Sequence, residues 1–219
     1  MTKTNQWSQF AQAFVRRHFP ESTVVQGERG DPAPATVREW SGDYLISFLC
    51  PWVLPAQVIA SARRAAINFH PAPPQYPGIG CYNFALYDGA QTYGVTCHRM
   101  APVVDSGPIV DVRRFAILPA DTVESLKGRS MATLLVQFYD ILTCIANDSE
   151  MPASSERWSG PRRTRRELDE LCRITPDLSQ DEIARRIRAT VFPSMPGPFI
   201  EIGGRRFDYR PDRRDETTR

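Results

Sequence analysis

Two short apolar stretches that lie close together in the sequence constrain the fold most. Residues 44–50 and 65–69 are apolar runs of strand length, and the segment between them, residues 55–64, opens with Pro55 and reads as a helix. A continuous apolar run is typical of a strand that is covered on both faces. Strand, helix and strand in this order predict a parallel βαβ unit, and therefore an α/β protein with a doubly wound, mostly parallel, Rossmann-like sheet.

The rest of the chain supplies further elements of this kind. An amphipathic helix is expected at the start, where Trp7, Phe10 and Phe14 share one face. Further strands are expected at residues 22–26, 92–100 and 109–117, short helices near residues 36–40 and 83–87, and a long helix at residues 121–147. We therefore assign residues 1–147 to a core domain, which a chain of 219 residues is long enough to bury.

A smaller unit is predicted after the core. Residues 148–160 are polar and small and read as a linker, and residues 161–209 read as an appendage of two helices and a hairpin that turns at Gly203 and Gly204. The remaining residues, 210–219, are charged and read as a disordered tail.

Composition excludes several classes of protein. A formal net charge of +2, from 27 basic and 25 acidic residues, gives no reason to expect a nucleic acid or a membrane as partner. The five cysteines are spread out and form no C-x-x-C pair, so we expect reduced thiols and no metal site. No apolar stretch approaches the length of a membrane span, and we expect a cytoplasmic protein.

Three polar residues form the candidate site. Asn68 and His70 stand two apart at the carboxyl end of a predicted strand, so they share a face at the edge where open α/β sheets bind ligands. Asp105 follows in a later loop. An amide donor, an imidazole and a carboxylate are what attack of an amine on a one-carbon acyl group requires. Without further information, hydrogen bonding at the start of a loop and a simple Asp-Ser-Gly turn remain alternatives.

The motifs around these residues resemble a known family. They are Asn68-x-His70-Pro71, Pro74-x-Tyr76-x-Gly78, Gly94-x-Thr96-x-His98 and Val104-Asp105-x-Gly107-x-Ile109. Together they are similar to the core signature of the folate-dependent formyltransferases, and the similarity covers roughly residues 44–142. That family includes glycinamide ribonucleotide, methionyl-tRNA and sugar-nucleotide formyltransferases.

The resemblance implies a catalytic role for each of the three residues. Asn68 would bind the formyl oxygen, His70 would take the proton of the attacking amine, and Asp105 would orient His70. For His98 it implies a structural hydrogen-bonding role rather than catalysis. No metal is implied.

The resemblance also implies a cosubstrate, 10-formyltetrahydrofolate, with Trp52, Val53, Leu54 and Val104 around its pterin ring. A role for these four side chains as ordinary core residues is the alternative. Members of the family begin with a strand before the first helix, whereas this chain starts directly at the helix. The sheet is therefore expected to lack its first strand.

The acceptor implied by the resemblance is the amine of a nucleotide-linked amino-dideoxy sugar, of the dTDP-4-amino sugar or GDP-perosamine type, as in lipopolysaccharide biosynthesis. The carboxyl-terminal appendage is too small for the tRNA enzyme and superfluous for the glycinamide ribonucleotide enzyme. The residues expected to bind the acceptor are Tyr76, Gly78, Phe192 and Tyr209.

Two other functions stay open on the sequence. One is formylation of a hydroxyornithine-like siderophore precursor, and the other is a truncated, non-catalytic folate-binding relic. The hairpin at Gly203 and Gly204 could equally form a homodimer contact, because a two-stranded ribbon rarely stands alone.

Overall fold

The structure is a computed structural model that describes residues 1–193 and 195–211. Most of the predicted disordered tail, residues 212–219, lies outside the described residues. Of the described residues, none belongs to a helix that is both long and apolar enough to cross a membrane. Nor do the described residues contain a group of three or more His, Cys, Asp or Glu side chains that could hold a metal ion.

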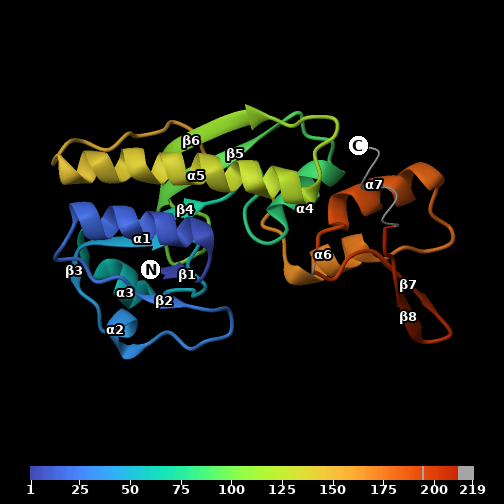
Figure 1. Ribbon diagram of the computed structural model, residues 1–219, viewed down its shortest axis with the longest axis horizontal. Helices are drawn as coiled ribbons and strands as arrows, with labels where there is room; N and C mark the ends of the chain where they lie inside the picture. The colour runs from blue at the N-terminus through green and yellow to red at the C-terminus, as the bar shows by residue number, and fades with distance from the viewer. Residues whose placement is uncertain (194, 212–219) are drawn as a thin grey trace. The chain divides into compact units, whose positions relative to one another are not determined.

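One mixed, mostly parallel sheet organises the core and confirms the predicted Rossmann-like class. Its strand order is β2-β1-β3-β4-β5-β6 (Figure 1). The strands are β1 (Thr2–Lys3), β2 (Gln26–Gly27), β3 (Gly42–Phe48), β4 (Ala62–His70), β5 (Thr92–Arg99) and β6 (Ile109–Ala116).

The first strand of the sheet is short rather than missing, which corrects the expectation from the sequence. Strand β1 pairs in parallel with β2 on one side and with β3 on the other. Helix α1 (Gln6–His18) begins directly afterwards, with Asn5 as its N-cap. Two residues are too few to show the alternation by which a strand is recognised, so no pattern in the sequence announced β1.

The strand that follows the candidate site runs antiparallel to its neighbour. Strands β3 and β4 are parallel, as expected, but β5 is antiparallel to β4, with Asn68 opposite His98. The helix between them, α4 (Cys81–Tyr87), is short, and the loop before it is rich in proline. An order of strand, helix and strand therefore did not make a parallel crossover here, because the chain enters β5 at the same end of the sheet at which it left β4.

The chain divides into two compact units, whose boundaries differ from the predicted domains. The first unit comprises Met1–Gln75, Gly94–Arg114 and Ser130–Gly160, and so includes the predicted linker. The second comprises Tyr76–Tyr93, Phe115–Arg129 and Pro161–Arg219. The predicted domains stay a prediction.

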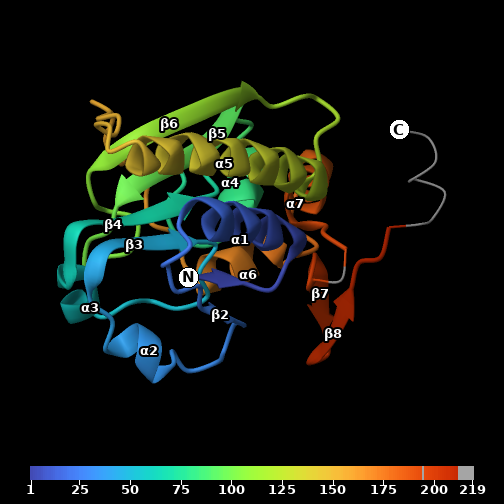
Figure 2. The same cartoon turned by 60° about the vertical axis from the view of Figure 1, so that its left-hand side comes forward.

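In the first unit, helices cover both faces of the sheet (Figures 1 and 2). Helix α1 and the later part of α5 (Val123–Ala146) pack on one face, with Phe48, Ile67 and Phe138 in a buried cluster. Helices α2 (Ala35–Arg38) and α3 (Ala56–Ala60) pack on the other face, in a cluster that includes Leu45 and Ala66. Helix α3 is shorter than predicted, because β4 already pairs with β3 from Ala62 onward.

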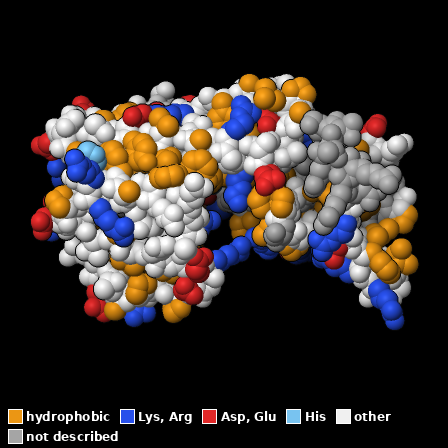
Figure 3. Space-filling model, viewed as in Figure 1, with side chains coloured by type: hydrophobic (Ala, Val, Ile, Leu, Met, Phe, Trp, Pro, Cys, Tyr) orange, Lys and Arg blue, Asp and Glu red, His pale blue; other side chains and the backbone are white. Residues whose placement is uncertain are grey.

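In the second unit, α4 packs against α7 (Gln180–Thr190), and α6 (Arg165–Cys172) also contacts α7. The predicted hairpin consists of β7 (Phe199–Ile202) and β8 (Arg205–Asp208). Its two turn residues, Gly203 and Gly204, both have positive φ, as tight two-residue hairpin turns require. Hydrophobic side chains are exposed on this hairpin (Figure 3), including Ile202 and Phe207.

Candidate functional site

A row of three polar side chains crosses three neighbouring strands. Ser47 of β3 is in register with Asn68 of β4, and Asn68 is in register with His98 of β5. Residues that face each other across strands project to the same side of a sheet. The row lies on the face covered by α2 and α3, because Asn68 is two residues from Ala66 of that cluster.

Hydrogen bonds fix the orientation of the Asn68 amide. The Ser47 hydroxyl donates to Asn68 Oδ1 at 2.6 Å, and Asn68 Nδ2 lies 3.0 Å from His98 Nε2. His98 Nδ1 is 2.9 Å from the Arg99 carbonyl oxygen, which can only accept, so we place the imidazole proton on Nδ1. Nε2 of the neutral ring then accepts from the amide. Since an amide nitrogen carries two hydrogens, Asn68 keeps a second donor for a ligand.

Asp105 lies between two imidazoles. Its Oδ2 is 3.5 Å from His70 Nδ1, and its Oδ1 is 3.6 Å from His98 Nε2. All three side chains are buried. These distances exceed a normal hydrogen bond, so the carboxylate acts on the two rings mainly through its charge.

The loop that carries Asp105 has an unusual backbone conformation. Asp105 has a φ of 50°, a conformation that residues other than glycine seldom adopt and that is found disproportionately at functional sites. Gly107 packs so closely on the backbone of Arg99 that a side chain there would overlap the Arg99 carbonyl oxygen. The close approach of this loop to the end of β5 brings the carboxylate to the imidazoles.

Trp158, in the segment after α5, packs against this group of side chains. Its indole lies 5.7 Å from the His70 ring and 5.0 Å from the His98 ring, measured between ring centroids and edge to face in both cases. Its Nε1 donates to the Gly107 carbonyl oxygen at 2.8 Å. One indole therefore contacts both imidazoles and the loop of Asp105.

A cavity of about 240 Å³ opens beside these groups. Asn68, His70 and Asp105, the three predicted catalytic residues, line it together. The four residues predicted around the pterin line the same cavity: Trp52, Val53, Leu54 and Val104. Its other lining residues are Ser47, Leu49, Cys50, Pro51, Ile59, Phe69, Pro71, His98, Met100, Ala101 and Pro102.

The loop after β3 presents a mixture of fixed and exposed side chains to this cavity. Trp52 is anchored by a hydrogen bond from Nε1 to the Asp31 carbonyl oxygen, and Leu54 is buried in the cluster beneath α2 and α3. Val53 and Val104 are 75% and 44% exposed, which is unusual for valine and leaves both available to an apolar ligand. Leu49, where the loop begins, has a φ of 55°.

The four predicted acceptor-binding residues lie in the second unit. Burial, followed by interaction with Asp88, raises the pKa of Tyr76 to about 12, so its hydroxyl stays protonated. Gly78, with a φ of 89°, forms a bridge to Arg163. Phe192 packs under the Lys127 ammonium group at 4.6 Å, and Tyr209 is 41% exposed.

Sequence reasoning missed Ser47 and Trp158 and undervalued His98. Ser47 is the only polar residue in the apolar run 44–50, and aligning the two predicted parallel strands would have placed it near Asn68. For Trp158 the sequence carried no signal, because it lies in a stretch without periodicity. His98 has the hydrogen-bonding geometry expected of it, but it contacts both Asn68 and Asp105.

The fold and this site define a class of protein, which comparison with known families identifies. The formyl transferase family matches residues 12–134, more than half of the chain, and the chain belongs to this family.

Sequence identity to the individual relatives is low. The chain is 27% identical over 164 residues to a GDP-perosamine N-formyltransferase of Brucella melitensis, and this match covers 74% of the chain and 62% of the relative. It is 28% identical over 153 residues to a methionyl-tRNA formyltransferase of Burkholderia ambifaria, covering 69% of the chain and 46% of the relative. The chain thus matches less than two thirds of the length of either relative.

Solved structures share the fold. A sugar N-formyltransferase from a Shewanella species superposes with a TM-score of 0.78 at 18% identity, covering 95% of this chain and 94% of that one. An N-formyltransferase from Helicobacter canadensis, in complex with folinic acid and dTDP-3-aminofucose, gives a TM-score of 0.72 at 16% identity, covering 93% and 83%.

Proposed function

We propose that this protein transfers the formyl group of 10-formyltetrahydrofolate to the amine of a nucleotide-linked amino-dideoxy sugar. The observation that carries the proposal is the convergence of Asn68, His70 and Asp105 on one cavity, with the amide of Asn68 held so that it donates. Membership of the formyl transferase family supports the type of reaction. The names of a curated relative and of a solved structure support the type of acceptor.

Asn68 would stabilise the negative charge that develops on the carbonyl oxygen during attack. Ser47 and His98 hold the two ends of its amide, so no reorientation is needed as the charge appears. A donor fixed in advance is more effective than a mobile one, because no energy is spent on orienting it as the transition state forms.

His70 would move the protons. The amine attacks the formyl carbon and becomes positively charged, and the neutral imidazole removes one proton from it. The nearby negative charge of Asp105 stabilises the imidazolium that results. The C–N bond to the folate nitrogen then breaks, and His70 returns the proton to that nitrogen, so the base is regenerated.

The residues around the cavity fit the folate cosubstrate, which supplies the formyl group. Exposed Val53 and Val104 offer apolar contacts to a flat ring, and Asn68 and His70 line the same cavity. The thiol of Cys50 also lines the cavity, but burial raises its pKa, which makes it a poor nucleophile. The chemistry therefore falls to Asn68, His70 and Asp105.

We assign recognition of the acceptor to Tyr76, Gly78, Phe192 and Tyr209. The hydroxyl of Tyr76 stays protonated and interacts with Asp88, which holds the ring in place, and the exposed ring of Tyr209 can stack on a base. A homodimer contact through the hairpin, a cytoplasmic location and a role in lipopolysaccharide biosynthesis remain further parts of the proposal.

The proposal is tested by assaying the purified protein with 10-formyltetrahydrofolate and a panel of amines. The panel contains GDP-perosamine, dTDP-linked 3-amino and 4-amino sugars, and a hydroxyornithine, and mass spectrometry detects the formylated product. We expect turnover with a nucleotide-linked sugar. Turnover with the hydroxyornithine alone would favour siderophore assembly, and folate binding without any turnover would indicate a non-catalytic relic.

Ser47→Ala tests whether the hydroxyl positions the amide. Losing its hydrogen bond to Asn68 Oδ1 should lower kcat by up to about tenfold, because such a bond contributes about 0.5–1.5 kcal/mol and each 1.4 kcal/mol is a factor of ten in rate. KM for folate should change little. Ser47→Thr keeps a hydroxyl and should recover most of the rate, whereas equal kcat values in Ser47→Ala and the wild type would remove Ser47 from the mechanism.

Trp158→Ala and Trp158→Phe separate two contributions of the indole. Phenylalanine keeps an aromatic ring beside the imidazoles but loses the hydrogen bond to Gly107. We expect kcat to fall about tenfold in Trp158→Ala and about threefold in Trp158→Phe, since an aromatic pair contributes about 0.5–1.5 kcal/mol. Equal losses in the two variants would show that ring contact with the histidines is unimportant.

A further inference from the structure

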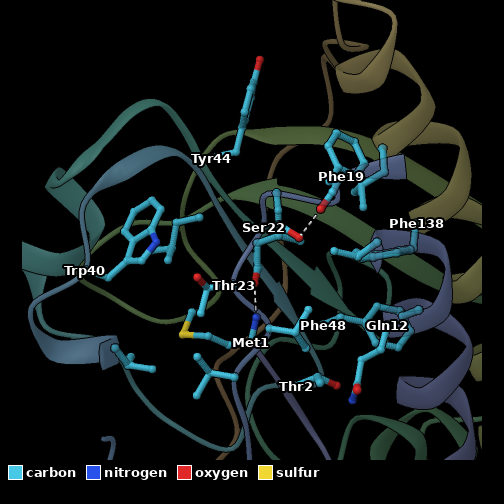
Figure 4. Close-up of a pocket in the computed structure, with 18 of the residues that line it drawn as sticks. Met1, Thr2, Gln12, Phe19, Ser22, Thr23, Trp40, Tyr44, Phe48 and Phe138 are labelled. Carbon is cyan, nitrogen blue, oxygen red and sulfur yellow. Dashed lines mark hydrogen bonds between the residues drawn. The ribbon is translucent and has the colours of Figure 1, made fainter. Parts of the chain in front are cut away.

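The first unit contains a groove that borders the loop of Asp105. The groove has a volume of about 610 Å³ and is lined by residues 106–109 of that loop and by residues 154–158. It differs from the apolar cavity of about 160 Å³ beside β1, which Phe48 and Phe138 help to line and which is separate from the catalytic residues (Figure 4). Only the groove therefore has a bearing on the site.

One wall of the groove belongs to the segment that carries Trp158. Residues 151–160, here called the strap, lie outside helices and strands. Because residues 154–158 and 106–109 both line the groove, a hollow rather than close packing lies between parts of the two segments. The position of Trp158 therefore depends on the separate contacts that attach the strap to the rest of the unit.

Backbone hydrogen bonds attach the strap on both sides of Trp158. The Ser154 amide donates to the carbonyl oxygen of Ile109, the first residue of β6, at 3.3 Å. The Ser159 amide donates to the Pro74 carbonyl oxygen at 3.1 Å. The strap is thus joined to β6 and to the loop that follows β4.

An ion pair attaches the strap between these two points. The Arg114 guanidinium group donates to both carboxylate oxygens of Glu156 at 2.6 Å, and such a bidentate pair fixes orientation as well as distance. The two side chains are 34% and 37% exposed, so the pair is partly shielded from water. Their hydrogen bonds raise the pKa of Arg114 and lower that of Glu156, so both groups are charged at neutral pH.

We propose that the Arg114–Glu156 ion pair is a positioning device for formyl transfer and acts through Trp158. It holds the strap two residues before the indole, whose contacts with both imidazoles limit how the His70 ring can turn. Neither charged side chain lines the catalytic cavity, so the pair does not bind substrate there. A small displacement of a base costs rate, because proton transfer needs a defined geometry. The expected effect on rate rests on the proposed function.

A double-mutant cycle tests whether the ion pair acts through the indole. We expect Arg114→Gln to lower kcat about threefold and to leave KM for 10-formyltetrahydrofolate unchanged, because a partly exposed pair contributes about 0.2–1 kcal/mol. In a Trp158→Ala background the same substitution should have no further effect. Arg63→Gln, which breaks an exposed ion pair with Asp43 in the same unit, is the matched control and should retain the wild-type kcat. Additive losses, or an unchanged kcat in Arg114→Gln, would overturn the proposal.

The indole N–H of Trp158 gives a second measurement that needs no turnover. Its NMR signal is assigned by its loss in Trp158→Phe, and its hydrogen bond to the Gly107 carbonyl oxygen slows its exchange with solvent. We expect faster exchange of this signal in Arg114→Gln and in Glu156→Gln, with Tm lower by no more than about 4 °C.

The two measurements separate this inference from the proposed function. Unchanged exchange of the indole N–H in both ion-pair variants would overturn the positioning role, whatever the activity of the wild type. Faster exchange in a protein that formylates no amine of the panel would uphold the link between the ion pair and the indole and contradict the proposed function instead.

Discussion

Replacing Asn68 with alanine should reduce kcat for formyl transfer by about 10²–10³-fold, the effect of removing one fixed donor from a developing oxyanion. Asn68 is central to the site, because hydrogen bonds hold its amide from both sides and one amide hydrogen is left to donate to the substrate. Single-turnover kinetics with 10-formyltetrahydrofolate and the sugar substrate identified in the panel would measure the loss. KM should change far less than kcat.

Asn147→Ala is the matched control, since Asn147 is exposed just after α5 and should leave the rate unchanged. Thermal unfolding of both variants separates a catalytic defect from a folding defect. A variant of Asn68 that folds normally and keeps more than about a third of the wild-type rate would contradict the oxyanion role.

Replacing His70 with glutamine should lower kcat by about 10²–10⁴-fold, the usual contribution of a positioned base. Glutamine can fill much of the space of the imidazole but cannot accept the amine proton at neutral pH. In the wild type the rate should fall as the pH drops, because a protonated imidazole cannot act as base. The pH–rate profile of His70→Gln should lose this acidic limb.

His18→Gln provides the comparison, because His18 is exposed at the end of α1 and takes no part in the site. It should retain both the wild-type rate and the acidic limb. An acidic limb that persists in His70→Gln would assign the base to another group, and His98, also in contact with Asp105, would be the next residue to replace.

The sequence was informative where a local pattern carries a structure. Alternation on a strand placed Asn68 and His70 on one face, and apolar runs of strand length revealed β3 and β4. The same reasoning could not give the direction of β5, which depends on how the proline-rich loop and α4 return the chain to the sheet. It is this antiparallel register that brings His98 opposite Asn68.

Contacts between segments that are far apart in the sequence could not be predicted either. Trp158 reaches the imidazoles from a segment without secondary structure, and only the folded chain shows that its indole meets both rings. Strand β1 could not be predicted for a related reason. Its two residues form a strand only because β2 and β3 pair with them from both sides.

Ser47, Asn68 and His98 all stand on strands, whereas the residues proposed to choose the acceptor lie in loops, in the segment before the hairpin and directly after it. Substitutions in those outer segments can accumulate without disturbing the amide and its two supports. Under the proposed function, changes in those outer segments would alter the choice of sugar while the formyl-transfer chemistry stays the same.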